Sequence, residues 1–282
     1  MTVCIALSPV FVSNAAGLNF FAERYEEFPD DAAAQKALGG PRGEGEWGGN
    51  SLDVCTLGNG GSIELGFEEA RRIFDGPGSD FIVFENAFQT LDAQPPNDPT
   101  GLYFAELMFV EVSTDGEVFA RFPALTTNTE PIHAGLDGLD AAEYSGFAGV
   151  HPIYANVDSN VIDPFDPSAA GGDAFDLADL ATHPLVLSGA VDLNRINWVR
   201  LVDIIGDGSV LDDAGNPIYD VYRYAGDPLV INGADVDALA VINGAAVPEP
   251  GSLSLMLAVL PALVAVSHYV RKGSQQKQEV FQ

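Results

Sequence analysis

The sequence predicts an all-β fold built from antiparallel strands. Short runs of apolar or alternating residues recur along the chain, without the intervening helical segments that an α/β fold would need. One Asp-Gly pair lies between two such runs, which is typical of a tight hairpin. The 282 residues include 30 Gly and 18 Pro, and 47% hydrophobic residues supply a sizeable core. These observations favour an antiparallel sandwich over a helical bundle.

The first elements follow from local patterns near the N-terminal end. Residues 30–38 predict a helix, because Asp residues occupy its first turn and Gly-Gly-Pro follows its last residue. Residues 62–67 alternate polar and apolar side chains, so Ile63, Leu65 and Phe67 should share the buried face of a strand.

A central strand is expected at 80–85, an apolar run between Asp80 and Glu85. An acid buried at the end of a sheet must be paired, hydrogen-bonded or metal-bound, so both carboxylates are of interest. Further strands are expected at 106–113, 117–122, 197–203 and 236–242, with residues 114–116 as the turn of a hairpin.

The chain is strongly acidic. It has 41 Asp and Glu against 12 Lys and Arg, which gives a net charge of −29, and nearly all of this charge lies within residues 17–247. Such a charge repels a phosphate backbone and an anionic membrane surface, so it excludes non-specific binding to nucleic acid or lipid headgroups.

Both chain ends differ from the acidic middle. Residues 1–16 are apolar and end in small residues, as a secretory signal peptide does, although the positive start of such a signal is missing and a truncated start is one explanation. A first buried strand is the alternative for this run. Residues 251–270 are apolar over about the 20 residues that a membrane-spanning helix requires. Residues 273–282 form a polar tail.

The C-terminal segment 248–272 resembles the PEP-CTERM sorting signal of Gram-negative bacteria. The resemblance rests on the order of a Pro-Glu-Pro motif, an apolar helix and a basic tip, carried by Val247, Pro248, Glu249, Pro250, Arg271 and Lys272. It implies export through the inner membrane to an exosortase, which cuts at the motif and releases or anchors the protein at the cell surface. Proteins of this kind are linked to exopolysaccharide and the biofilm matrix.

Residues 17–247 are expected to form one exported domain, which resembles a recurrent domain of bacterial cell-surface proteins. The resemblance implies a jelly-roll-like or discoidin-like sandwich, an architecture that many carbohydrate-binding modules use. It is carried by ALGGP (37–41), GNGGSIELGF (58–67), DGPGSDFIVFEN (75–86), VEVSTDG (110–116), GGDAFDLADL (171–180) and DVDALAVIN (235–243).

Bound Ca²⁺ is the cofactor that the composition suggests. Cys55 is the only cysteine within 17–247, so no internal disulfide can stabilise the domain, whereas metal ions would also neutralise the acids. The first candidate ligands lie in an acidic region as two pairs, each spaced by three residues: Asp163 with Asp166, and Asp173 with Asp176. Asp235 and Asp237 share one face at the start of the last strand and form a second candidate pair. A solvated acidic loop is the alternative interpretation.

Aromatic residues offer a platform for sugar rings. Tyr219, Tyr222 and Tyr224 cluster in one loop-like region, although packing beneath a long loop explains them equally well. We therefore expect an exported surface or matrix protein, structural or adhesive, with exosortase and exopolysaccharide as partners. An extracellular polysaccharide-active enzyme, a glycoside hydrolase or lyase, is the alternative, but the scattered histidines and the absence of nucleophile motifs do not favour it.

Overall fold

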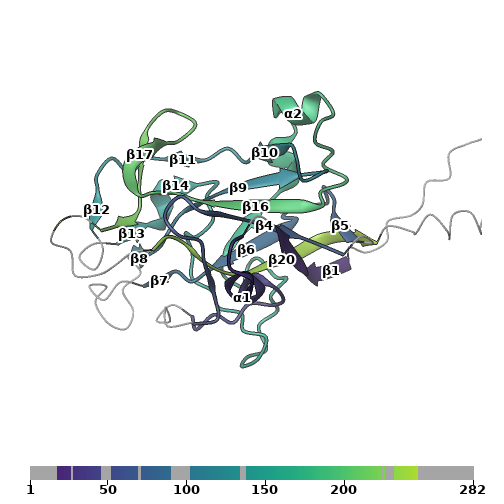
Figure 1. Cartoon of the computed structure of the whole chain (residues 1–282), viewed down its shortest axis with the longest axis horizontal. Helices are drawn as coiled ribbons and strands as arrows, with labels where there is room; N and C mark the ends of the chain where they lie inside the picture. The colour runs from purple at the N-terminus through teal and green to yellow at the C-terminus, as the bar shows by residue number, and fades with distance from the viewer. Residues whose placement is uncertain are drawn as a thin grey trace, which may run out of the picture. The chain divides into compact units, whose positions relative to one another are not determined.

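Two antiparallel sheets form the body of the fold (Figure 1). The structure is a computed structural model, and it describes residues 18–26, 28–45, 52–68, 71–89, 102–133, 138–223, 225 and 232–246. The first sheet has the order β1 (Leu18–Phe21), β20 (Asp235–Ala246), β6 (Phe81–Glu85) and β15 (Asp173–Phe175), and β3 (Cys55–Thr56) and β5 (Arg71–Ile73) also pair with β20. The second has the order β10 (Phe119–Arg121), β9 (Met108–Ser113), β16 (Trp198–Asp203), β4 (Ser62–Gly66) and β2 (Arg24–Glu26).

The strands of these sheets pair in a nested order. Four antiparallel pairs lie one inside the next along the chain. The outermost is β1 with β20, followed inward by β4 with β16, β6 with β15, and β9 with β10. A long hairpin folded over on itself produces this pattern. The prediction of an all-β antiparallel fold is therefore confirmed.

Smaller sheets of two or three short strands accompany the two main sheets. They are β7 (Phe88–Gln89) and β13 (Leu139–Asp140) on either side of β8 (Leu102–Phe104), β11 (Leu125–Thr126) with β14 (Tyr144–Ser145), β17 (Asp207–Leu211) with β18 (Pro217–Tyr219), and the parallel pair β12 (Ile132–His133) with β19 (Val221–Tyr222). The helices of the described residues are single turns: α1 (Asp31–Ala34), η1 (Gln35–Ala37), η2 (Ala141–Glu143), η3 (Leu177–Leu180) and α2 (Pro184–Leu187).

The main core lies between the two sheets. Ile63 and Leu65 of β4 and Phe81 and Val83 of β6 belong to one buried cluster, together with residues of β9, β16 and β20. The other face of β6 is also covered, because Ile82 and Phe84 pack against a loop that includes Ile153. Burial on both faces explains why the sequence of β6 is apolar throughout.

The local predictions are confirmed at most elements. All six expected strands are present, although β10 and the helix are shorter than expected: the helix divides into α1 and η1. Asp30 caps α1 by accepting hydrogen bonds from the amides of Ala32 and Ala33. Gly116 has φ 81° in the turn between β9 and β10, as an Asp-Gly hairpin requires.

The two terminal predictions lie outside the described residues. These are the signal segment 1–16 and the sorting segment 248–272 with its residues Val247, Pro248, Glu249, Pro250, Arg271 and Lys272. Within the part of the chain that the structure describes, no helix is long and apolar enough to cross a membrane. The segment 251–270 therefore stays a prediction.

Asp237 of β20 generates a prediction about pH. Its side chain is fully buried, Oδ2 accepts a hydrogen bond from the Arg42 amide at 2.7 Å, and Oδ1 has no hydrogen-bond partner. Burial raises the pKa of Asp237 to about 7. The folded state therefore binds a proton that the unfolded chain has already lost, so folding stability falls as the pH rises from about 4 to about 7.

We expect Asp237→Asn to remove this part of the pH dependence. As the pH rises from 4 to 8, wild type loses stability at this site and the variant does not, so the variant's free energy of unfolding should rise relative to that of wild type. Each pKa unit of the shift corresponds to about 1.4 kcal/mol. Urea unfolding of both proteins at several pH values measures the difference. The exposed Glu117→Gln variant is the control. A difference that is constant with pH would contradict the buried-charge explanation.

Candidate functional site

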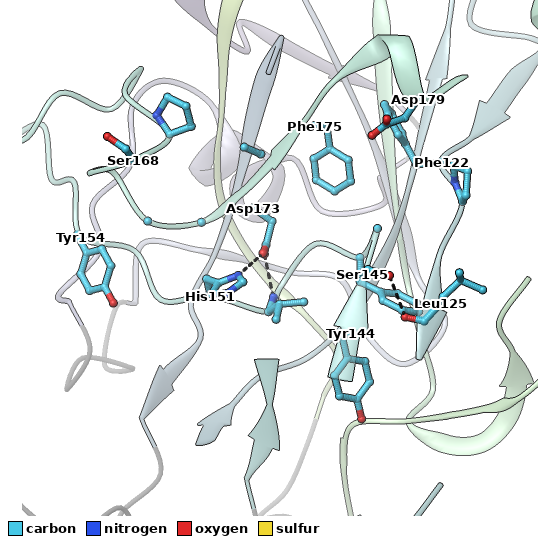
Figure 2. A pocket seen from close by; sticks show the side chains of 18 residues that line it. Phe122, Leu125, Tyr144, Ser145, His151, Tyr154, Ser168, Asp173, Phe175 and Asp179 are labelled. Carbon is cyan, nitrogen blue, oxygen red and sulfur yellow. Dashed lines mark hydrogen bonds and ion pairs between the residues drawn. The ribbon is translucent and has the colours of Figure 1, made fainter. Parts of the chain in front are cut away.

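An open groove of about 720 Å³ lies beside β15 and β14. Figure 2 shows His151 and Asp173 near its centre, with Tyr154 on one side and Ser145 and Leu125 on the other. Its aromatic lining includes Phe122 and Phe175, and these two rings pack edge-to-face at 5.0 Å between centroids. Because both rings also belong to the main core, this wall of the groove is held rigidly.

Two glycines allow the chain to enter β15 at this place. Gly171 and Gly172 have φ 74° and 68°, which side chains rarely adopt. A Cβ atom on Gly171 would lie 2.1 Å from the carbonyl oxygen of Pro152, and one on Gly172 would lie 2.6 Å from that of Val83. The Gly-Gly pair therefore sets the close approach that brings Asp173 to the groove.

Asp173 and His151 form a polar pair at the centre of the groove. Asp173 is buried, and its Oδ2 accepts a hydrogen bond from the Val150 amide at 2.8 Å, while its Oδ1 lies 2.7 Å from His151 Nδ1. The hydrogen bond to Asp173 raises the pKa of His151, although burial opposes the shift. The His151 side chain is 51% exposed, so the pair offers a fixed polar group to a molecule in the groove.

A second feature is a cluster of three aspartates at the far end of β15. Oxygen atoms of Asp75, Asp80 and Asp176 lie within 4.8 Å of one another, and this aspartate cluster could hold a metal ion. The register explains the convergence. Phe81 of β6 pairs with Phe175 of β15 in an antiparallel ladder, so the residue before β6 and the residue after β15 lie at the same sheet end.

Asp80 is the buried member of the aspartate cluster. Its Oδ1 accepts hydrogen bonds from the Gly76 amide and from Asn243 Nδ2, both at 2.8 Å, and its Oδ2 accepts one from the Leu177 amide at 2.7 Å. Burial nevertheless raises the pKa of Asp80 to about 6. Burial and the nearby charge of Asp176 also raise the pKa of Asp75. Among the described residues, no ion pair joins these aspartates to a basic side chain, so a cation would relieve their repulsion.

The structure places the predicted metal ligands at separate positions. Asp163 and Asp166 cap loop turns, where they accept hydrogen bonds from the amides of Phe165 and Ser168. Asp173 holds His151, as described above, and only Asp176 joins the aspartate cluster. The remaining candidates, Asp235 and Asp237, lie in β20, where Asp235 accepts a hydrogen bond from the hydroxyl group of Thr56.

Sequence reasoning missed the partners of Asp176. The sequence predicts that Asp80 is a buried acid at a strand end, but its spacing to Asp75 and Asp176 does not indicate that the three residues meet. The signal that could have found the cluster is the pairing of β6 with β15, because that register places residues 80 and 176 together. Glu85, at the other end of β6, accepts a hydrogen bond from the Asp235 amide at 3.1 Å.

Of the predicted tyrosine platform, Tyr219 and Tyr222 do not line the groove. The carbonyl oxygen of Tyr219 accepts a hydrogen bond from the hydroxyl group of Tyr144 at 2.6 Å. Tyr222 lies in β19 and pairs with His133 of β12. Tyr224 lies outside the described residues, so a sugar-binding role for the three tyrosines stays a prediction.

Comparisons with protein-family models, curated proteins and solved structures find no match for this chain.

The aspartate cluster predicts that Ca²⁺ stabilises the fold. A cation whose free concentration is 100 times its Kd stabilises the folded state by about 2.7 kcal/mol. For a domain of this size, that raises the melting temperature by roughly 5–10 °C. We expect this rise for the full chain in millimolar Ca²⁺ relative to chelator, measured by differential scanning fluorimetry. NaCl at matched ionic strength should give a smaller rise, because it only screens the charges.

Two variants locate the effect. Asp176→Asn should reduce the Ca²⁺-dependent rise and keep the rise in NaCl. Asp163→Asn is the matched control, because it makes the same change of charge in a loop turn outside the cluster. Equal losses in the two variants would assign the effect to overall charge instead of the aspartate cluster.

Proposed function

We propose that this protein is an exported surface or matrix protein of a Gram-negative bacterium that binds a polysaccharide in the groove beside β15. The observation that carries the proposal is the composition of that groove: a partly exposed tyrosine, Tyr154, stands beside the fixed polar pair of His151 and Asp173. Concave sites of this kind combine apolar surface with a few fixed polar groups that orient a ligand. A sugar ring has one apolar face and several hydroxyl groups, which fits both parts.

The net charge narrows the class of polysaccharide. A chain with a net charge of −29 repels polyanionic polymers at low ionic strength. Asp173 and Asp179 add carboxylates to the groove lining itself. The proposed ligand is therefore a neutral exopolysaccharide.

The fold is proposed to be a jelly roll. The nested pairing of β1 with β20, β4 with β16, β6 with β15, and β9 with β10 supports this topology. Lectin domains are among the proteins that use it. Because one fold hosts many functions, the topology adds only an analogy, and the groove remains the basis of the proposal.

Ca²⁺ is the proposed metal of the aspartate cluster. All ligands available there are oxygen atoms, and they come from Asp75, Asp80 and Asp176 in irregular segments next to strands. Ca²⁺ accepts six to eight oxygen ligands in flexible geometry, whereas Mg²⁺ requires a near-ideal octahedron. The ion would tie the segment after β5 to the start of β6 and the end of β15. It would thereby fix the end of β15, whose residues line the groove.

Export and sorting complete the proposal. The ordered motif, apolar segment and basic tip support recognition by an exosortase, with the segment 251–270 as a membrane-spanning intermediate. Acidic residues are concentrated in 17–247, the part that would reach the surface or the biofilm matrix.

An enzyme is the second candidate, and one observation favours it. Asp173 and Asp179 both line the groove, and paired carboxylates can hydrolyse glycosidic bonds. Asp173 is held by the Val150 amide and by His151. That arrangement suits a positioning role better than proton transfer to a substrate.

The groove predicts a specific loss of binding. Tyr154→Ala in the full chain should weaken binding to the neutral exopolysaccharide fraction of the producing cells about tenfold, which corresponds to about 1.4 kcal/mol of lost contact. Affinity electrophoresis measures it, and alginate is the polyanionic comparison that should bind weakly. Tyr222→Ala is the control from the alternative tyrosine platform. Loss of binding in Tyr222→Ala but not in Tyr154→Ala would place the binding site at the tyrosine platform. Release of reducing ends from the polysaccharide by the wild type would favour the enzyme as the function.

The sorting signal predicts a processed product. In a host with an exosortase, the mature protein should lack the residues that follow Pro250, because cleavage occurs at the motif. Intact-mass measurement of the surface-exposed protein gives the length of its C-terminal end. Replacement of Pro248, Glu249 and Pro250 by Ala should leave the segment 251–270 attached. A wild-type mass that still includes this segment would rule out such processing.

A further inference from the structure

A second group of buried acids surrounds a small cavity, separate from the aspartate cluster. Glu106, Asp203 and Asp220 line this Glu106 cavity, which has a volume of about 10 Å³. Asn59 and Gly233 also contribute to its wall. The volume is roughly that at which a cavity admits one water-sized occupant.

The strand register brings two of these acids together. Asp203 is the last residue of β16 and pairs with Met108, the first residue of β9. Glu106 lies two residues before Met108, so it is at the same end of the sheet as Asp203. Asp220 enters from the segment between β18 and β19, and it accepts a hydrogen bond from the Leu107 amide at 2.9 Å.

The two aspartates already hold the chain around the cavity. Asp203 accepts hydrogen bonds from the amides of Gly60 at 2.6 Å and Ala234 at 2.7 Å. It therefore joins the loop after β3 to the residues before β20. These contacts are structural, and they leave the carboxylate charges without a cationic partner among the described residues.

Glu106 differs from both aspartates, because one of its oxygens has no partner. Its side chain is only 9% exposed, and Oε1 makes no hydrogen bond. The charges of Asp235, Asp220 and Asp203 repel it. Glu85 Oε2, on the neighbouring β6, is also buried without a partner. A buried carboxylate oxygen without a donor or a counter-charge is costly, so the cavity favours a positively charged occupant.

We propose that the Glu106 cavity binds a second Ca²⁺ ion, independent of the ion at the aspartate cluster. Glu106 Oε1 would be a direct ligand, and Asn59 and the backbone carbonyl groups of the wall can supply neutral oxygens. Within the described chain, three carboxylate oxygens approach within 4.8 Å of one another only at the aspartate cluster. The ion in the Glu106 cavity therefore takes no more than two carboxylates directly. Ca²⁺ fits better than Mg²⁺, since Mg²⁺ retains several waters that this volume does not admit.

The proposal is tested by counting bound ions. Equilibrium dialysis of the full chain against Ca²⁺ in buffered salt of about 0.15 M suppresses weak surface binding. Wild type should bind two Ca²⁺ tightly. Asp176→Asn should bind one, Glu106→Gln should bind one, and the double variant should bind none. Gln at position 106 keeps the shape of the side chain, and the exposed Glu117→Gln control should bind two.

The outcomes separate the two sites. A folded Glu106→Gln protein that still binds two Ca²⁺ overturns the second site, and so does an Asp176→Asn protein that binds none. Loss of one ion in Glu106→Gln alone, with two retained in Asp176→Asn, upholds the Glu106 cavity and refutes the aspartate cluster. If Glu106→Gln does not fold in chelator, the Ca²⁺ count of Asp176→Asn tests the second site instead. One bound ion supports the Glu106 cavity, and none overturns it.

Discussion

The structure depends on carboxylates that are buried at the ends of its strands. Asp80, Asp203 and Asp220 each accept hydrogen bonds from backbone amides of segments that are distant in the sequence, so they join loops to the ends of the sheets. In a chain whose 231-residue middle holds one cysteine, these contacts take the place that disulfides have in many exported proteins. They carry a cost, because burial opposes ionisation: it raises the pKa of Asp80 and of Asp203 to about 6. Burial therefore favours a bound proton or a cation at these positions over the bare carboxylate charge.

This constraint also shapes the groove. The Leu177 amide donates to Asp80, which fixes the chain just after β15. At the other end of the same strand, Asp173 accepts from the Val150 amide and holds His151 over the groove. β15 is thus held at both ends by carboxylates, one inside the aspartate cluster and one inside the groove. A cation bound at the cluster would therefore also stabilise the wall of the groove.

The sequence was sufficient for the strands and insufficient for the sites. The apolar run of β6 and the Asp-Gly turn before β10 are local signals, and both were predicted correctly. The acids are different, because Asp serves equally well as a metal ligand and as the cap of a turn. Asp163 and Asp166 cap turns, whereas Asp176 meets Asp75 and Asp80 only through the pairing of two strands that are distant along the chain. The terminal segments lie outside the described residues, so their roles rest on the sequence pattern alone.

Ca²⁺ that binds at the aspartate cluster should displace protons held there by buried carboxylates. The most direct measurement is the number of protons released when Ca²⁺ binds to the full chain at pH 6, obtained by isothermal titration calorimetry in buffers of different ionisation enthalpy. Because burial raises the pKa of Asp80 to about 6, and this carboxyl group must lose its proton to bind a metal, we expect net proton release. The release should decline at pH 8. Binding heats that are the same in every buffer at pH 6 would show that no proton leaves, and that these carboxylates are already ionised before the metal binds.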